Sequence, residues 1–263
     1  MMNALTLSEL ERLLKNKWIW CLLVCTPILA YVAGNYLLDS SNVISAGLFM
    51  VEGLQVNLYL MCNIAVAAIV GAVFTEEYRG GQLRLLFLRS YSRANIFFSK
   101  LIVINIMIVV LLIVMAISLS IIGLVQFPHE GENQISLVLT IKIIAPYYFM
   151  AYLTLMGISC LFSYMALISK NVSFMLGLCV GYVLVTLLFD GLYLYFANLF
   201  ESGSLIHELV AYALIPYMQH TGLYSALNGN IHSISAMAII LVFYMFVFVW
   251  SAYRRFVIDD YLY

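Results

Sequence analysis

The sequence has very few charged residues. Asp, Glu, Lys and Arg make up only 10% of its 263 residues, whereas soluble domains contain about 25%. Hydrophobic residues make up 65%, and the mean hydropathy is +1.03. This composition excludes a water-soluble fold and predicts an all-α integral membrane protein.

The chain also lacks the patterns that would give it a cofactor or a metal of its own. The nucleotide-binding pattern G-x-x-x-x-G-K-[ST] occurs nowhere in it. Its five Cys lie in apolar runs without metal-ligand spacing, so we expect them to be small buried hydrophobes. Its four His are widely spaced, and a metal site would need them to converge in the fold. We expect solvated loop histidines, no metal and no cofactor.

Six apolar runs are long enough to cross a membrane. The hydrocarbon core of a bilayer is about 30 Å thick and requires about 20 apolar residues in a helix. The predicted transmembrane helices cover approximately 18–38, 56–74, 96–125, 143–168, 172–196 and 234–253. We therefore interpret residues 1–263 as a single transmembrane domain.

The distribution of Lys and Arg predicts the orientation of this domain. With both termini in the cytoplasm, only Lys142 of the twelve Lys and Arg residues lies on the outer side. The other eleven lie in inner segments, as the tendency of cytoplasmic loops to be positively charged requires: Arg12, Lys15, Lys17, Arg79, Arg84, Arg89, Arg93, Lys100, Lys170, Arg254 and Arg255. We expect a multi-pass protein of the cell membrane with outer loops at 39–55 and 127–133.

Two further segments have a distinct pattern. Residues 1–17 begin with a possible capping box at 6–9, followed by leucines at helical spacing, and predict an amphipathic cytoplasmic helix rather than a removable signal peptide. Between residues 197 and 233 the apolar stretch 205–215 is too short to cross a bilayer. This segment predicts a re-entrant or interfacial helical hairpin on the outer side, packed against protein.

A polar interval at 75–100 separates the second and third predicted spans and holds five of the twelve Lys and Arg residues. Leu83, Leu86 and Phe87 fall at i, i+3 and i+4, with arginines among them. That spacing predicts a short helix lying along the membrane surface. Ser92 is a good N-cap for the helix that returns to the membrane.

The order of features in this interval resembles the membrane subunit of ABC-2 type transporters. The features are the end of an apolar span followed by Glu77, Gly81, Leu83, Leu85, Leu86, the pair Ser92-Arg93, and Lys100 opening the next span. The six-span layout extends the resemblance over the whole chain. In that family this loop carries a coupling helix that docks onto an ATP-hydrolysing subunit.

The resemblance implies a permease half-subunit of an ATP-driven exporter, with ATP and Mg on a separate ATPase chain and a second permease copy or paralogue as partner. It implies an ATPase-coupling role for Glu77, Arg79, Gly81, Leu83, Arg84, Leu86, Phe87 and Arg89. The short outer loops favour a hydrophobic or amphipathic substrate, such as an antimicrobial peptide, a drug or a lipid. We expect membrane lipid, but no nucleic acid, among the other partners.

Three alternatives remain open at this stage. The arginines of the loop could serve membrane topology alone. An ion-coupled secondary transporter or channel would use ionisable residues inside the membrane, for which the candidates are Asp190 and Lys142. An intramembrane protease is suggested by Glu76-Glu77 followed by Arg79, but no His lies in a predicted span to complete its acid–base chemistry. Asn57, Asn63 and Asn105 are expected to serve helix packing.

Overall fold

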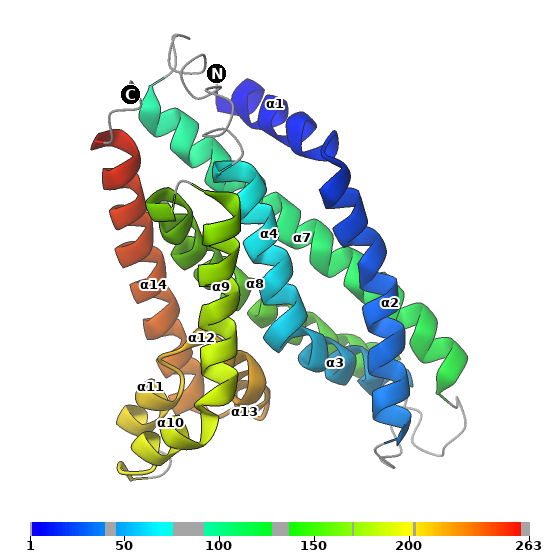
Figure 1. Cartoon of the computed structure of the whole chain (residues 1–263). Helices are drawn as coiled ribbons and strands as arrows, with labels where there is room; N and C mark the ends of the chain where they lie inside the picture. The colour runs from blue at the N-terminus through cyan, green and yellow to red at the C-terminus, as the bar shows by residue number, and fades with distance from the viewer. Residues whose placement is uncertain are drawn as a thin grey trace.

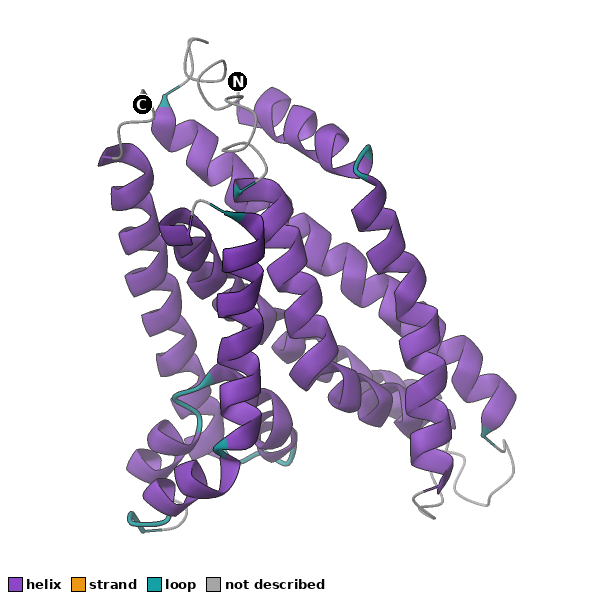
Figure 2. Cartoon of the chain, viewed as in Figure 1, coloured by secondary structure: helices purple, strands orange, loops and turns teal. Residues whose placement is uncertain are grey.

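The computed structural model describes residues 2–39, 46–75, 92–127, 137–169, 171–201 and 204–258, and the regular structure in these ranges is helical (Figure 2). The all-α prediction is confirmed for this part of the chain. Five of the described helices are long and apolar enough to cross a membrane. They are α2 (Lys17–Asp39), the run Leu48–Phe74, α7 (Arg93–Gln126), α8 (Leu137–Ser169) and α14 (Ile231–Ile258).

The second of these runs is longer than the sequence predicted. Helix α3 (Ala46–Asn57) continues through a π-helical turn, η1 (Leu58–Cys62), into α4 (Asn63–Phe74). The predicted outer loop 39–55 is therefore wrong for residues 46–55. Phe49 and Leu54 are fully buried, and the Phe49 ring stacks on Phe127 with 4.6 Å between ring centroids. This packing stabilises helical structure in a segment whose Ser, Asn and Gly content indicated a loop.

The predicted fifth span is interrupted. Helix α9 (Val172–Leu188) has 17 residues, about 26 Å at 1.5 Å per residue, and the backbone leaves helical geometry at Phe189 before α10 (Asp190–Ala197). A continuous helix over 172–196 is therefore wrong. The break precedes Gly191, and glycine is a poor helix former. The count of six spans stays a prediction.

The core of the bundle lies around the run Leu48–Phe74 and α8. The most apolar windows of these two are 61% and 67% buried, against 28% for α2 and 33% for α14. Figure 1 shows α4 at the centre of the bundle and α2 and α14 at opposite edges. The exposed faces of α2 and α14 are apolar, as expected for helices that face lipid or another membrane protein.

The two ends of the bundle differ. Helix α1 (Met2–Leu14) lies at the end that carries the labelled termini (Figure 1). At the opposite end α10 gathers with three short elements, α11 (Leu205–Ala211), α12 (Ile215–Tyr217) and α13 (Leu223–Leu227), and the π-helical turn η2 (Met218–Gly222) lies between the last two. Gly229 has φ of +80°, which only glycine adopts readily, and turns the chain into α14.

Candidate functional site

The eight residues that the resemblance implies for ATPase docking lie outside the described residues, so their roles stay predictions. They are Glu77, Arg79, Gly81, Leu83, Arg84, Leu86, Phe87 and Arg89. The structure does describe both ends of the loop, Thr75 after α4 and Ser92 before α7. The Ser92 hydroxyl accepts a hydrogen bond from the backbone N–H of Asn95 at 3.2 Å, which confirms its N-cap prediction.

A buried charge cluster holds the base of this loop. The Lys100 ammonium is fully buried, lies 3.3 Å from Glu9 Oε1 and donates to the carbonyl oxygen of Val73 at 3.1 Å. Arg12 Nη2 lies 2.9 Å from Glu9 Oε2 and donates to the same carbonyl at 3.4 Å. The cluster therefore joins α1, the last turn of α4 and the first turns of α7.

Each member of the cluster lowers the desolvation cost of burying another member. A buried ammonium requires a counter-charge and hydrogen-bond acceptors, because desolvation of an isolated ion costs several kcal/mol. The Val73 carbonyl belongs to the last turn of α4, where carbonyl oxygens lack N–H donors within the helix. Two cationic donors, Lys100 and Arg12, satisfy it. Their positive charge is also favourable at the C-terminus of a helix, where the helix dipole is negative.

The local sequence explains how these side chains reach one another. Leu5, Glu9 and Leu13 are spaced four residues apart and share the buried face of α1. Lys100 has the same relation to Ile96 and Ile104 on the buried face of α7. The capping-box interpretation of residues 6–9 is wrong, because α1 begins at Met2 and Glu9 points to Lys100 instead of to the helix start. The helix also ends at Leu14, before the predicted limit at residue 17.

The return of the loop is tied to α14. Arg93, the first residue of α7, donates through Nη1 to the carbonyl oxygen of Val257 at 2.6 Å. Below it, the Phe97 ring contacts Phe74 of α4 and Phe256 of α14, at centroid distances of 6.0 and 5.6 Å. Polar and aromatic contacts thus connect the two ends of the loop to α1, α4, α7 and α14.

At the other end, the predicted outer hairpin enters the bundle through Gln219. Its Nε2 donates to Asn63 Oδ1 and to Thr154 Oγ1, both at 3.2 Å, and Asn63 Nδ2 donates to Gln219 Oε1 at 2.6 Å. All three side chains are fully buried. Asn63 follows η1 and Gln219 lies in η2, so two π-helical turns face one another across this amide pair. Such turns are rare and are frequent at functional sites.

The position of Asn63 indicates how deep the hairpin reaches. It lies 11 residues before Phe74, about 17 Å along the helix axis. This is about half of the 30 Å hydrocarbon thickness. Residues 215–219, in α12 and η2, are all buried, so this part of the hairpin packs inside protein.

Tyrosines fix the rest of the hairpin. The Tyr217 hydroxyl donates to the carbonyl of Thr186 in α9, and the Tyr193 hydroxyl of α10 donates to that of Val210. The Tyr193 and Tyr217 rings stack with centroids 4.5 Å apart. Tyr212 packs on Gly222, where a Cβ would lie 3.2 Å from the ring, and burial raises the Tyr212 pKa, so it stays a neutral phenol.

The two predicted pathway or gate residues lie on different helices. Asp190 opens α10, immediately after the break at Phe189. Lys142 lies in α8, which begins six residues earlier than predicted, and its side chain is exposed. Of the three asparagines expected to serve packing, Asn63 bonds to Gln219 and Asn105 accepts from the Tyr152 hydroxyl at 3.3 Å, whereas Asn57 donates within its own helix.

The predicted burial is confirmed for three of the five cysteines, and the prediction of solvated loop histidines is wrong for His207. Cys62, Cys160 and Cys179 are buried as predicted, but Cys21 and Cys25 are exposed because α2 lies at the edge of the bundle. Among the described residues, no group of three or more His, Cys, Asp or Glu side chains could hold a metal ion. His207 is not a solvated loop residue, since its Nδ1 lies 2.8 Å from the Ala197 carbonyl oxygen in the partly buried hairpin.

Comparison with known protein families identifies the family to which this chain belongs. The family described as "ABC-2 family transporter protein" matches residues 5–187, which include α1 from Leu5 onwards, the loop and its buried base. The chain belongs to the ABC-2 transporter family. It is therefore a multi-pass membrane subunit of an ABC transporter, with a transport role that implies association with an ATP-binding cassette ATPase. A search of curated proteins finds no match.

The family match includes the charge cluster and ends at the last turn of α9, before the hairpin and α14. Sequence reasoning missed the Glu9–Lys100 pair and the Asn63–Gln219 pair. A signal for the first was present, because Glu9 and Lys100 each interrupt an apolar helix face. For the second, 156 residues of separation left no local signal.

Proposed function

We propose that this ABC-2 subunit is one half of an exporter that moves a hydrophobic or amphipathic substrate across or out of the cell membrane. ATP hydrolysed on a separate chain drives the movement, and a second permease copy or paralogue completes the transporter. The observation that carries the proposal is the family match over residues 5–187, which includes the loop 75–100. The preference for an antimicrobial peptide, a drug or a lipid rests on the short predicted outer loops.

The base of the loop supports a coupling role. A docking segment transmits work only if it is joined to the elements that must move. Lys100 and Arg12 bind the same carbonyl at the end of α4, and Arg93 binds the end of α14. A shift of the loop caused by the ATPase would therefore pull on α1, α4, α7 and α14 together. The eleven inner Lys and Arg support a cytoplasmic location for this end of the bundle.

Secondary transport has less support. It would place ionisable side chains near the bilayer midplane. Among the residues whose burial the structure describes, which do not include Asp190, the buried acidic and basic side chains are Glu9, Lys100 and Glu208. The first two form the loop-base cluster, and Glu208 lies in α11 of the outer hairpin. The buried polar groups around Asn63 are two amides and a hydroxyl, which hold helices together and carry no charge.

The double substitution Leu86→Asp and Phe87→Asp tests the docking role. It keeps every arginine and puts carboxylates into the proposed apolar contact, where burial without a partner costs several kcal/mol. We expect the variant to insert into the membrane normally but to lose co-purification of its ATPase and ATP-dependent efflux. Arg84→Lys is the charge-matched control, because it keeps the positive charge of the loop and should keep membrane insertion and topology.

One result would reject ATPase coupling through this loop. It is normal insertion of the double variant together with wild-type transport that requires no nucleotide. The secondary-transporter alternative would then take its place.

A further inference from the structure

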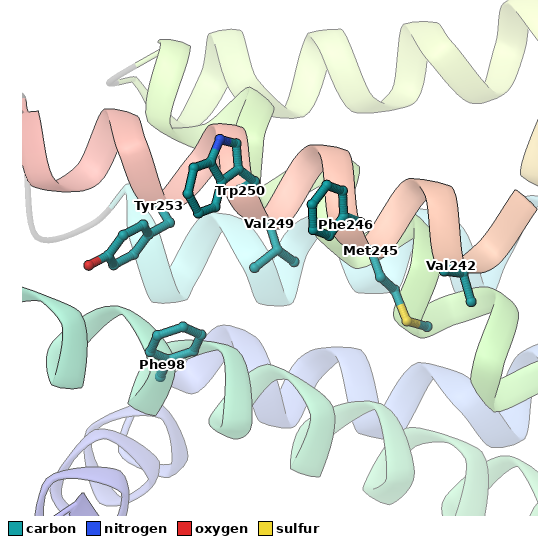
Figure 3. Close-up of a pocket in the computed structure, with 7 residues that line it drawn as sticks. All are labelled: Phe98, Val242, Met245, Phe246, Val249, Trp250 and Tyr253. Carbon is teal, nitrogen blue, oxygen red and sulfur yellow. The ribbon is translucent and has the colours of Figure 1, made fainter.

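An apolar groove lies between α7 and the exposed face of α14 (Figure 3). Its volume is about 650 Å³, within the range of about 300–1,000 Å³ that ligand sites occupy. Phe98 comes from α7 and the other lining residues come from α14: Val242, Met245, Phe246, Val249, Trp250 and Tyr253. An acyl chain would meet only apolar and aromatic side chains along this groove.

The length of the groove matches one leaflet of a membrane. Val242 and Tyr253 mark its two ends and are 11 residues apart on α14, about 17 Å at 1.5 Å per residue. Half of the hydrocarbon core is about 15 Å. The groove therefore extends from one membrane interface to approximately the midplane.

Aromatic side chains close the interfacial end of the groove. The Tyr253 ring stacks on Phe98 with 5.9 Å between centroids and contacts Phe97 at 5.8 Å, so α7 and α14 touch there. Tyr253 and Trp250 are the residue types that concentrate at the headgroup level of membranes. Figure 1 shows the two helices diverging from this point towards the opposite end of the bundle.

A positively charged side chain lies just beyond the aromatic end of the groove. Arg254 is exposed and lies four residues after Trp250, so it continues the face of α14 that carries Phe246 and Trp250. A guanidinium binds phosphate through paired N–H donors. The positive-charge bias places this end of α14 in the cytoplasm, where membrane leaflets carry anionic lipids.

We propose that the groove between α7 and α14 binds one acyl chain of an anionic phospholipid of the cytoplasmic leaflet, whose phosphate is held by Arg254. The proposal does not depend on ATPase docking, so it stands or falls separately from the proposed export function.

Charge complementarity favours an anionic lipid over a neutral lipid and over an apolar helix from a second copy. Arg254 lies where the headgroup would lie, and an apolar helix face would bring no counter-charge to it.

Tryptophan fluorescence tests the proposal directly, because Trp18, Trp20 and Trp250 are the three tryptophans of the chain. Trp18→Phe with Trp20→Phe leaves Trp250 in the groove, and Trp18→Phe with Trp250→Phe leaves Trp20 on α2. Both reporters are 55% exposed, which makes Trp20 a matched control. Each protein is reconstituted in phosphatidylcholine vesicles with a small fraction of chain-brominated phosphatidylglycerol or chain-brominated phosphatidylcholine, whose bromines quench nearby indoles.

We expect the brominated anionic lipid to occupy the site next to Trp250 about fivefold more than the neutral one, the preference that one basic side chain provides. Arg254→Gln should remove this preference at Trp250 and leave quenching of Trp20 unchanged. Equal quenching of Trp250 by the two lipids, or a preference that survives Arg254→Gln, would overturn the proposal. Quenching of Trp20 with no quenching of Trp250 would also overturn it, because protein would then cover the groove.

Discussion

Replacing Lys100 by Met tests whether the loop base is held by the buried charge cluster. The substitution removes the ammonium and keeps an unbranched side chain of similar length. It leaves the Glu9 carboxylate, which is only 5% exposed, without its buried partner. It also takes one of two donors from the Val73 carbonyl. We therefore expect the packing of α1 on α4 and α7 to weaken.

The size of the effect follows from the geometry. Removing one member of a buried ion pair costs about 3–5 kcal/mol. Arg12 remains 2.9 Å from Glu9 and is partly exposed to solvent, which limits the penalty on the carboxylate. We expect a loss at the bottom of the range, about 3 kcal/mol, or a fall of about 140-fold in the ratio of folded to unfolded protein. Lys15→Met, the same change at an exposed lysine, should alter stability by less than about 0.5 kcal/mol.

Reversible unfolding in mixed micelles with increasing SDS measures these differences, and a double-mutant cycle assigns them to the pair. Glu9→Gln alone leaves the Lys100 ammonium buried without a counter-charge and should also destabilise. The double variant Lys100→Met with Glu9→Gln should lose much less than the sum of the two single losses. If the losses added to within about 0.5 kcal/mol, Glu9 and Lys100 would not be coupled, and the account of the loop base would be refuted.

Three other measurements address the rest of the molecule. Gln219→Leu leaves the Asn63 amide buried without its partner and should cost about 1–2 kcal/mol in the same SDS titration; unchanged stability would show that the amide pair does not hold the hairpin. An impermeant thiol reagent applied to intact cells should label a cysteine placed at Asn133 but not one placed at Ser92. Labelling at Ser92 would show that the predicted topology is wrong. Asp190→Asn should reduce transport if its charge serves the pathway, and unchanged expression and transport would assign Asp190 to a passive interfacial position.

The sequence by itself determined the fold class, five of the transmembrane helices and the family. Scarcity of charge and the length of the apolar runs are properties that any fold of the chain must accommodate, so they predict membrane helices without knowledge of contacts. Local hydrogen bonding was predictable at the Ser92 cap, but not at residues 6–9, because α1 begins at Met2. Helix ends that depend on distant packing were not predictable. Residues 46–55 are helical although their composition did not indicate it, because Phe49 packs on Phe127.

Only the tertiary structure decided which polar side chains meet. Spacing within one helix shows that Glu9 lies between two leucines, but it does not show that the opposing helix offers an ammonium 91 residues away. The same holds for Asn63 and Gln219, which lie 156 residues apart, and for the groove, which forms because α7 and α14 meet at Tyr253 and then diverge. A buried charge or amide is stable only beside its partner, and folding, not sequence spacing, brings the partners together.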